Sequence, residues 1–123
     1  MAVVVDASAV AAVTFNEPSA AKVLDRLAGH ALVAPTLLDY ELASIGWKKL
    51  RHHPDRGAAI LATLTRTRRL RIDRVTPVMG GVVALAHAFD ITPYDASYLW
   101  VAKSLGAELV TLDQRLARAA GTF

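Results

Sequence analysis

Apolar residues occur along this chain in two patterns, as short continuous runs and as longer segments with helical spacing. Residues 2–5 (AVVV) form an apolar run that ends at Asp6, and further apolar runs occur within 31–34 and 108–112. Such runs are typical of strands that are buried on both faces of a parallel sheet. Residues 71–75 (RIDRV) alternate charged and apolar positions instead, and we expect a further strand there.

Proline, glycine and capping residues divide the remaining segments into helices. Pro18 stands in the first turn of one expected helix and Gly29 follows its end, which are favoured places for both residue types. Thr36 and Thr92 each precede an aspartate by three positions, the spacing of a capping box, so we expect a helix to begin after each threonine, with Asp39 and Asp95 as the acids of the two boxes. The expected helices cover residues 7–14, 18–28, 37–51, 54–70, 77–89, 93–105 and 114–120.

The alternation of strands and helices indicates an α/β fold. Right-handed crossovers place helices on both faces of the sheet, so we expect three layers, α/β/α, around a central parallel sheet of four strands. The length of 123 residues fits a single domain over residues 1–123. In open sheets of this kind, ligands bind at the carboxyl ends of the strands.

Composition excludes several classes of function. The chain has no cysteine, which rules out disulfides, zinc sites with thiolate ligands and cysteine nucleophiles. The Gly-rich motifs for dinucleotides and ATP and the GxSxG motif of serine hydrolases are absent from the sequence. The longest uncharged stretch, residues 75–89, is shorter than the roughly 20 residues that span a bilayer. With no basic, apolar leader at its start, the protein is expected to be cytoplasmic.

Four carboxylates stand where the fold predicts a ligand crevice. Asp6 follows the first expected strand and Asp113 the last, although aspartate at such positions also serves as an ordinary helix N-cap. Asp95 lies on the apolar stripe of its helix, and Glu41 lies among leucines one turn into another helix. An isolated ionised carboxylate in such surroundings is costly, so it is usually paired or metal-bound.

Taken together, these four acids predict an oxygen-only, strongly negative pocket. Carboxylate oxygens without cysteine or histidine partners suit Mg²⁺ or Mn²⁺ better than zinc. Mutual repulsion would raise some of the carboxyl pKa values in the absence of a cation. We therefore expect a divalent-metal site formed by Asp6, Glu41, Asp95 and Asp113.

The net charge of +3 conceals a strongly basic middle segment. Residues 48–74 carry nine basic and two acidic residues, whereas the rest of the chain has a net charge of −4. Arginine matches the geometry of phosphate oxygens, so a basic surface beside a metal pocket is the arrangement expected of a nuclease. The residues proposed to contact RNA are Lys48, Lys49, Arg51, Arg66, Arg68 and Arg69. The few aromatic residues form no stacking ladder in the sequence.

The order and spacing of four segments resemble a known family. VVVDAS, LLDYELAS, TPYDASYLWVAKSLG and LVTLDQRLARAA are similar to the acidic motifs of PIN-domain nucleases, specifically the VapC-type toxins of bacterial toxin–antitoxin modules. The resemblance implies that Asp6, Glu41, Asp95 and Asp113 are the metal-pocket acids. It also implies that Ser8 and Thr111 are hydroxyl neighbours that orient a water or a carboxylate.

The same resemblance implies further properties. These are a Mg²⁺- or Mn²⁺-dependent endoribonuclease activity, homodimerisation and inhibition by a VapB-like antitoxin that itself binds DNA. The family commonly has a fifth strand, whereas only residues 121–123 follow Ala120 here, so that strand would be short or missing.

Two other functions remain open. The chain could be a non-catalytic basic module that binds RNA or protein, with the acids serving only as caps. A phosphoryl-acceptor receiver domain is a second alternative, but the aspartate in HHPDRG, Asp55, is expected at a helix start rather than after a central strand.

Overall fold

The protein is built around a parallel sheet in the order β3-β2-β1-β4, as seen in a computed structural model that describes residues 1–121. Its strands are β1 (Ala2–Val5), β2 (Ala31–Pro35), β3 (Ile72–Val75) and β4 (Glu108–Val110). β1 pairs with β2 on one side and with β4 on the other, with Val4 opposite Val33 and Leu109. The expected four-stranded parallel sheet is confirmed over the described residues, whereas Thr122 and Phe123, where a fifth strand would continue, lie outside them.

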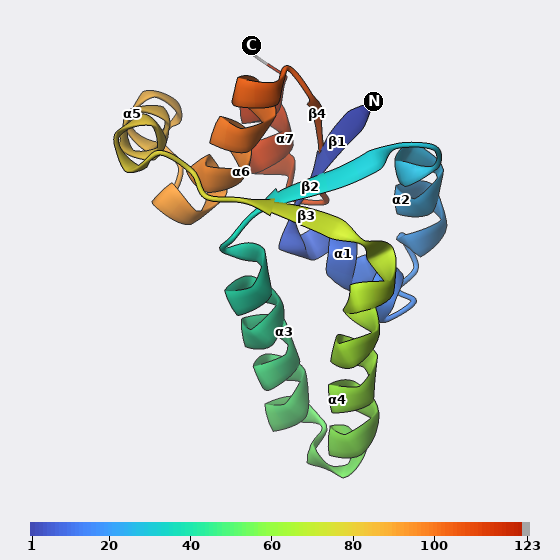
Figure 1. Ribbon diagram of the computed structural model, residues 1–123. Helices are drawn as coiled ribbons and strands as arrows, with labels where there is room; N and C mark the ends of the chain where they lie inside the picture. Colours follow the sequence, from blue (N-terminus) through green and yellow to red (C-terminus); the bar gives the residue numbers. More distant parts are fainter. Residues whose placement is uncertain (122–123) are drawn as a thin grey trace.

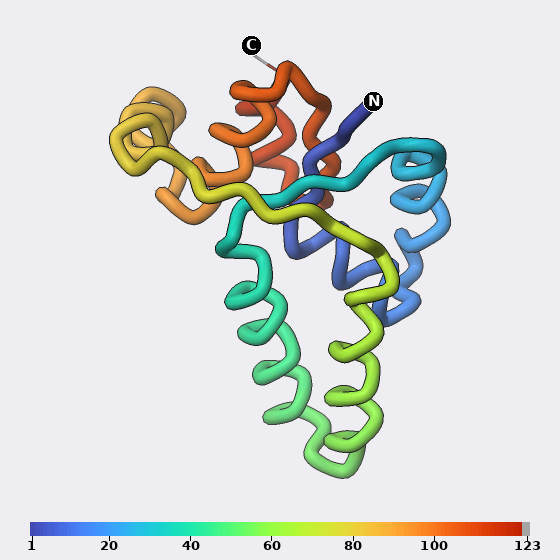
Figure 2. Tube along the Cα trace, viewed as in Figure 1, coloured from blue at the N-terminus to red at the C-terminus, as the bar shows by residue number. Residues whose placement is uncertain are grey.

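Helices cover both faces of this sheet (Figure 1). On one side lie α1 (Ala7–Thr14), α2 (Ala20–Leu27), α3 (Leu38–His52) and α4 (Gly57–Thr65). On the other side lie α5 (Met79–Phe89), α6 (Pro93–Leu105) and α7 (Gln114–Ala120). The Cα trace in Figure 2 shows α3 and α4 as a hairpin that extends away from the sheet. No helix among residues 1–121 is long and apolar enough to cross a membrane.

The core lies where β1 and α6 meet. Val3, Val4 and Val5 are all buried, because β1 is an inner strand with helices above and below it. Tyr98 and Leu99 of α6 are also buried, and α6 packs against β1, β2 and β4. The three-layer arrangement therefore rests on the apolar runs that the sequence places in these elements.

β3 is an edge strand, which explains its charged residues. Asp73 and Arg74 are exposed on it, and charge at an edge discourages pairing with another sheet. The Arg74 guanidinium donates to both carboxylate oxygens of Asp39, at 2.7 and 3.3 Å. The expected Thr36–Asp39 capping box is therefore wrong: α3 has Leu37 at its N-cap with no side-chain cap, and Asp39 is paired across to β3 instead.

Two expected elements end earlier than their sequence pattern indicates. The helix expected over 54–70 is divided into a 3₁₀ turn (η1, Pro54–Arg56), α4, and a second 3₁₀ segment (η2, Arg66–Leu70). Arg71 then adopts the left-handed backbone conformation, with φ of 49°, which stops the helix and turns the chain into β3.

The strand expected over 108–112 ends at Val110, because Thr111 and Leu112 bond to residues that follow β1.

The order of the strands fixes where a ligand can bind. From β1 the chain moves outward to β2 and β3, and then returns across the sheet to place β4 on the other side of β1. The direction of winding thus reverses between β1 and β4, and a crevice opens at the carboxyl ends of these two strands. Asp6 and Asp113 follow these two strand ends.

We predict that two neighbouring glycines of α5 respond oppositely to alanine. A Cβ on Gly81 would lie 2.7 Å from Cδ1 of the Trp100 indole on α6, so Gly81→Ala should destabilise the protein by about 1–3 kcal/mol. Gly80 has open space around it, so Gly80→Ala should be neutral or stabilising by up to about 1 kcal/mol. Urea unfolding of both variants measures the difference, and a Gly81→Ala variant as stable as Gly80→Ala would contradict this packing.

Candidate active site

Asp6 is the buried centre of the site, with 6% of its surface exposed. It is the N-cap of α1, and its Oδ1 accepts from the Ala9 amide at 3.0 Å and from the Ser8 hydroxyl at 2.7 Å. Its Oδ2 accepts from the hydroxyl of Thr111. Donors on both oxygens offset the cost of burying this carboxylate and fix its orientation.

Ser8 and Thr111 also connect the end of β1 to the loop after β4. The Leu112 amide donates to Ser8 Oγ at 3.0 Å, and the Asp113 amide donates to Thr111 Oγ1 at 3.0 Å. Asp113 in turn caps α7, since its Oδ1 accepts from the backbone amides of the first turn at 2.9 and 3.1 Å. The helix N-cap role considered from the sequence is therefore confirmed for both Asp6 and Asp113. The two caps lie close to each other, so the two acids line the same cleft.

Glu41 is held by a residue whose role the sequence pattern did not reveal. The Tyr98 hydroxyl donates to Glu41 Oε1 at 2.6 Å, which joins α3 to α6 across the crevice. Tyr98 is buried, and its position on the apolar stripe of α6 gave it the appearance of an ordinary core residue. The hydroxyl of Tyr98 could have indicated this role, because a buried tyrosine hydroxyl usually forms a hydrogen bond. Its partner here is 57 residues away in the sequence.

Asp95 lies in the first turn of α6, half-buried beside the other acids. The expected Thr92 cap is present, because Thr92 Oγ1 accepts from the Asp95 amide at 3.1 Å. That bond uses the backbone of Asp95, while its carboxyl group lines a cleft of about 440 Å³. The same cleft is lined by Asp6, Glu41 and Asp113, so all four predicted acids converge there.

The four acids interact electrostatically. Burial raises the pKa of Asp6; the hydrogen bonds from Thr111, Ser8 and Ala9 lower it in part, and the charge of Asp113 adds a smaller increase. The pKa of Glu41 is raised by burial and then by the charges of Asp95 and Asp6. The pKa of Asp95 is raised by burial and then by Asp113 and Asp6. Like charges in a partly dry cleft thus favour proton uptake, or a cation that takes the place of the proton.

Comparison with known proteins agrees with this geometry. The PIN domain family model matches residues 3–122. The chain belongs to the PIN-domain family. It is 33% identical to "Ribonuclease VapC3" of Pyrobaculum aerophilum over 95% of this chain and 93% of that protein. It is 37% identical to "Ribonuclease VapC9" of Mycobacterium tuberculosis over 94% of this chain and 88% of that protein. These relatives place this PIN domain in the VapC group.

A solved structure supports the same assignment. The crystal structure of PAE2754 from Pyrobaculum aerophilum superimposes with a TM-score of 0.79 at 30% sequence identity. The alignment covers 97% of this chain and 84% of that one. The α/β/α architecture expected from the sequence is therefore that of a PIN domain.

The acids of this PIN domain have the donor atoms that a hard cation prefers, but their side chains do not form a closed coordination site. Their donors are all oxygen, the ligand type that Mg²⁺ and Mn²⁺ take, and three of the four have raised pKa values. Within residues 1–121, no three acidic or histidine side chains stand close enough to hold an ion as placed. As placed, the acids therefore supply the donor atoms for such an ion but not a closed coordination geometry.

The basic residues of this PIN domain do not form one surface. Lys48 lines the carboxylate cleft, whereas Lys49 on the same helix faces the Phe15 ring at 4.6 Å and Glu17 at 3.9 Å. Arg51 stacks on the Trp47 ring at 4.8 Å and borders a neighbouring basic pocket with Lys48. Arg66, Arg68 and Arg69 lie in η2, before the start of β3 and away from the carboxyl ends of the strands.

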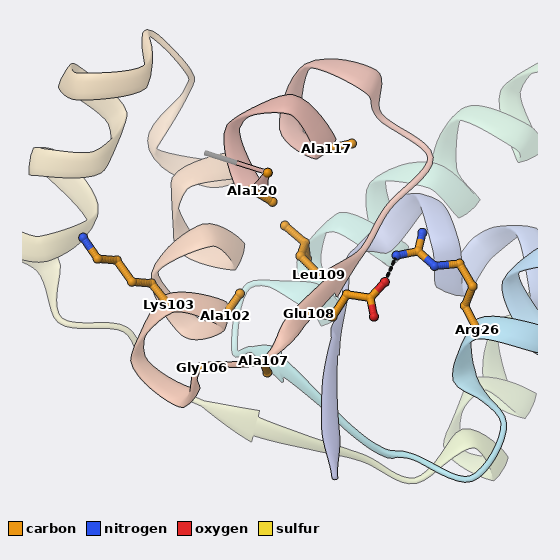
Figure 3. Close-up of a pocket in the computed structure, with 10 residues that line it drawn as sticks. Arg26, Ala102, Lys103, Gly106, Ala107, Glu108, Leu109, Ala117 and Ala120 are labelled. Atoms are coloured by element: carbon orange, nitrogen blue, oxygen red, sulfur yellow. Dashed lines mark hydrogen bonds and ion pairs between the residues drawn. The ribbon is translucent and has the colours of Figure 1, made fainter. Parts of the chain in front are cut away.

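A second cleft of about 520 Å³ lies at the opposite end of β4 (Figure 3). Its acid, Glu108, is already paired with Arg26, and alanines and Leu109 form much of the remaining wall. This cleft is larger than the carboxylate cleft, but within residues 1–121 its lining holds no group of acids whose charges remain uncompensated. The carboxylate cleft is therefore the candidate active site.

We predict that Glu41→Gln stabilises the protein at neutral pH. Because burial and its acidic neighbours raise the folded-state pKa of Glu41 above its unfolded value, the stability linked to this group is present at low pH and is lost as pH rises through the folded pKa. Glutamine still accepts from Tyr98 but carries no charge. After a discount for solvent screening, we expect the melting temperature to rise by about 2 °C.

Thermal melts of wild type and Glu41→Gln at neutral pH and at acid pH, below the ordinary carboxyl pKa, measure this effect. The gain should disappear at acid pH, where wild-type Glu41 is itself protonated. A Glu41→Gln variant that melts below wild type at neutral pH would show that the ionised carboxylate is not under strain.

Proposed function

We propose that this protein is an endoribonuclease and the toxin of a toxin–antitoxin module. The observation that carries the proposal is the convergence of Asp6, Glu41, Asp95 and Asp113 on one cleft at the switch point of the sheet. The relatives named as VapC ribonucleases support the same substrate class. The reaction is hydrolysis of an RNA phosphodiester.

We further propose that the four acids hold Mg²⁺ or Mn²⁺. The chemistry that such an ion supplies when bound is activation of a water nucleophile and stabilisation of the leaving oxygen. It would also compensate the repulsion that raises the pKa of Asp6, Glu41 and Asp95.

The residues of the chain have separable roles in this proposal. Ser8, Thr111 and the Ala9 amide hold Asp6 in one orientation, so this carboxylate is the fixed reference point of the cleft. Tyr98 holds Glu41 in the same way. Lys48 supplies positive charge at the edge of the cleft, where it can bind a phosphate that the acids alone would repel.

The proposed partners follow from the VapC assignment. They are an RNA substrate, a VapB-like antitoxin and a second copy of the chain in a homodimer, with DNA bound only indirectly through the antitoxin. The site residues, the identity of the metal ion and RNA contacts by Lys49, Arg51, Arg66, Arg68 and Arg69 remain predictions.

The main alternative is a non-catalytic module that binds RNA or protein. The capping bonds of Asp6 and Asp113 favour it, because they give these two acids a structural role. They do not account for Glu41 and Asp95, whose carboxyl groups line the same cleft. The receiver-domain alternative finds no support, since Asp55 lies in η1, between α3 and α4, rather than after a strand.

We predict that Asp95→Asn lowers cleavage of single-stranded RNA by at least roughly 100-fold, because the variant loses a charge that the reaction needs. Circular dichroism and thermal melts verify that the fold is retained. Wild type should cleave with Mg²⁺ or Mn²⁺ and not in excess EDTA. The products should carry 5′-phosphate and 3′-hydroxyl ends, because water rather than the RNA 2′-hydroxyl is the nucleophile.

Asp25→Asn is the matched control, since Asp25 is an exposed aspartate of α2 outside the cleft. It should cleave like wild type. Full activity of Asp95→Asn, or 2′,3′-cyclic phosphate products, would refute the proposed hydrolysis.

A further inference from the structure

Two exposed tyrosines stand at the rim of the carboxylate cleft. Tyr40 is 77% exposed and Tyr94 is 61% exposed, although both belong to helices with well-buried faces. They are 54 positions apart in the sequence, yet both line the cleft that holds the four acids. Exposed aromatic rings beside a reaction site commonly bind a flat substrate group by stacking on it.

The same two tyrosines also line a second groove, of about 340 Å³, next to the cleft. Pro77, Val82 and Pro93 give this groove apolar walls, and Thr36 and Ser97 place hydroxyl groups on its lining. Leu37, Tyr40 and Tyr94 are shared by the groove and the cleft, so the two spaces adjoin. A flat, mainly apolar group with polar edges is the chemistry that fits such a groove.

On its other side the cleft adjoins a basic pocket. Lys48 lines both spaces, and Arg51 and His52 complete the pocket, which has a volume of about 380 Å³. Tyr40, Ser44, Lys48 and Arg51 follow one another at spacings of four, four and three residues, which places them on one face of α3. From Tyr40 to Arg51 this face is about 16 Å long.

Groove, acids and basic pocket therefore form one path along α3. A strand of nucleic acid has groups that suit these three spaces in the same order. A base would occupy the groove, the phosphodiester beside it would lie at the acids, and further phosphates would lie at the basic pocket. A base in a duplex is stacked on both faces and cannot enter a side groove, whereas an unpaired base can stack on aromatic rings. The groove is therefore accessible to an unpaired base but not to a base held in a duplex.

We propose that Tyr40 and Tyr94 form a base-binding subsite, in which an unpaired base next to the scissile phosphate stacks on the two rings, and that Lys48 and Arg51 bind phosphates on the other side of the cleft. This inference rests on the proposed endoribonuclease function and adds the residues that bind the base. Base stacking on an aromatic ring changes affinity by roughly 5- to 150-fold when the ring is removed.

The test compares cleavage of RNA by Tyr40→Ala and Tyr94→Ala with cleavage by Tyr40→Phe and Tyr94→Phe, which keep the ring. The substrates are a single-stranded RNA that wild type cleaves, selected from a randomised pool, the same strand in a duplex, and the same strand with an abasic residue beside the cleavage site. Leu61→Ala, at an exposed leucine of α4, controls for loss of surface apolar area.

Each alanine variant should lose at least about 5-fold in kcat/KM on the intact single strand. The phenylalanine variants, which keep the ring, should lose less than the alanine variants, and Leu61→Ala should cleave like wild type. The abasic strand should be cleaved slowly, and at the same rate by wild type and the alanine variants. Without the base, the tyrosine ring has no stacking partner, so its removal should have no further effect. The duplex should be resistant.

Three results would overturn the inference. Alanine variants that cleave the single strand at the wild-type rate would leave the endoribonuclease function standing and assign the groove to a protein partner. Equal cleavage of duplex and single strand would remove the selectivity for unpaired bases. Failure of wild type to cleave any member of the randomised pool would refute the proposed function and this inference with it.

Discussion

The buried carboxylate of Asp6 is the interaction on which the site depends. Hydroxyls of Ser8 and Thr111 and the first turn of α1 satisfy it, and the same two hydroxyls bond to the loop after β4. The ends of β1 and β4 are thereby fixed to each other at the point where the winding of the sheet reverses. Asp113 is thereby held close to Asp6, because Thr111 donates to the Asp6 carboxylate and accepts from the Asp113 amide.

The site is stabilised locally but strained electrostatically. Capping bonds at Asp6 and Asp113 and the Tyr98–Glu41 hydrogen bond hold the acids near one another. Their like charges in turn raise the pKa of Asp6, Glu41 and Asp95, after burial itself. A cleft with such repulsion is suited to a cation and to a phosphate that binds with it.

The strands and the convergence of the four acids could be predicted from sequence, because strand ends and helix faces follow from local periodicity. Contacts between distant segments could not. The pairing of Asp39 with Arg74, which replaces the expected cap, depends on β3 lying beside β2. The basic segment is continuous in the sequence, yet Lys48 lines the cleft whereas Lys49 faces the Phe15 ring. Three further arginines lie in η2, which precedes β3. The tyrosines at the cleft rim were likewise brought together only by the fold.

The central claim is that the acids form one interacting cluster, and a carboxyl NMR titration of Asp95 in wild type and in Asp113→Asn tests it most directly. Asparagine keeps the cap of α7, so only the charge is removed. The account predicts that the pKa of Asp95 falls in Asp113→Asn, since the Asp113 charge is the second cause of its elevation after burial. An unchanged Asp95 pKa would contradict the cluster.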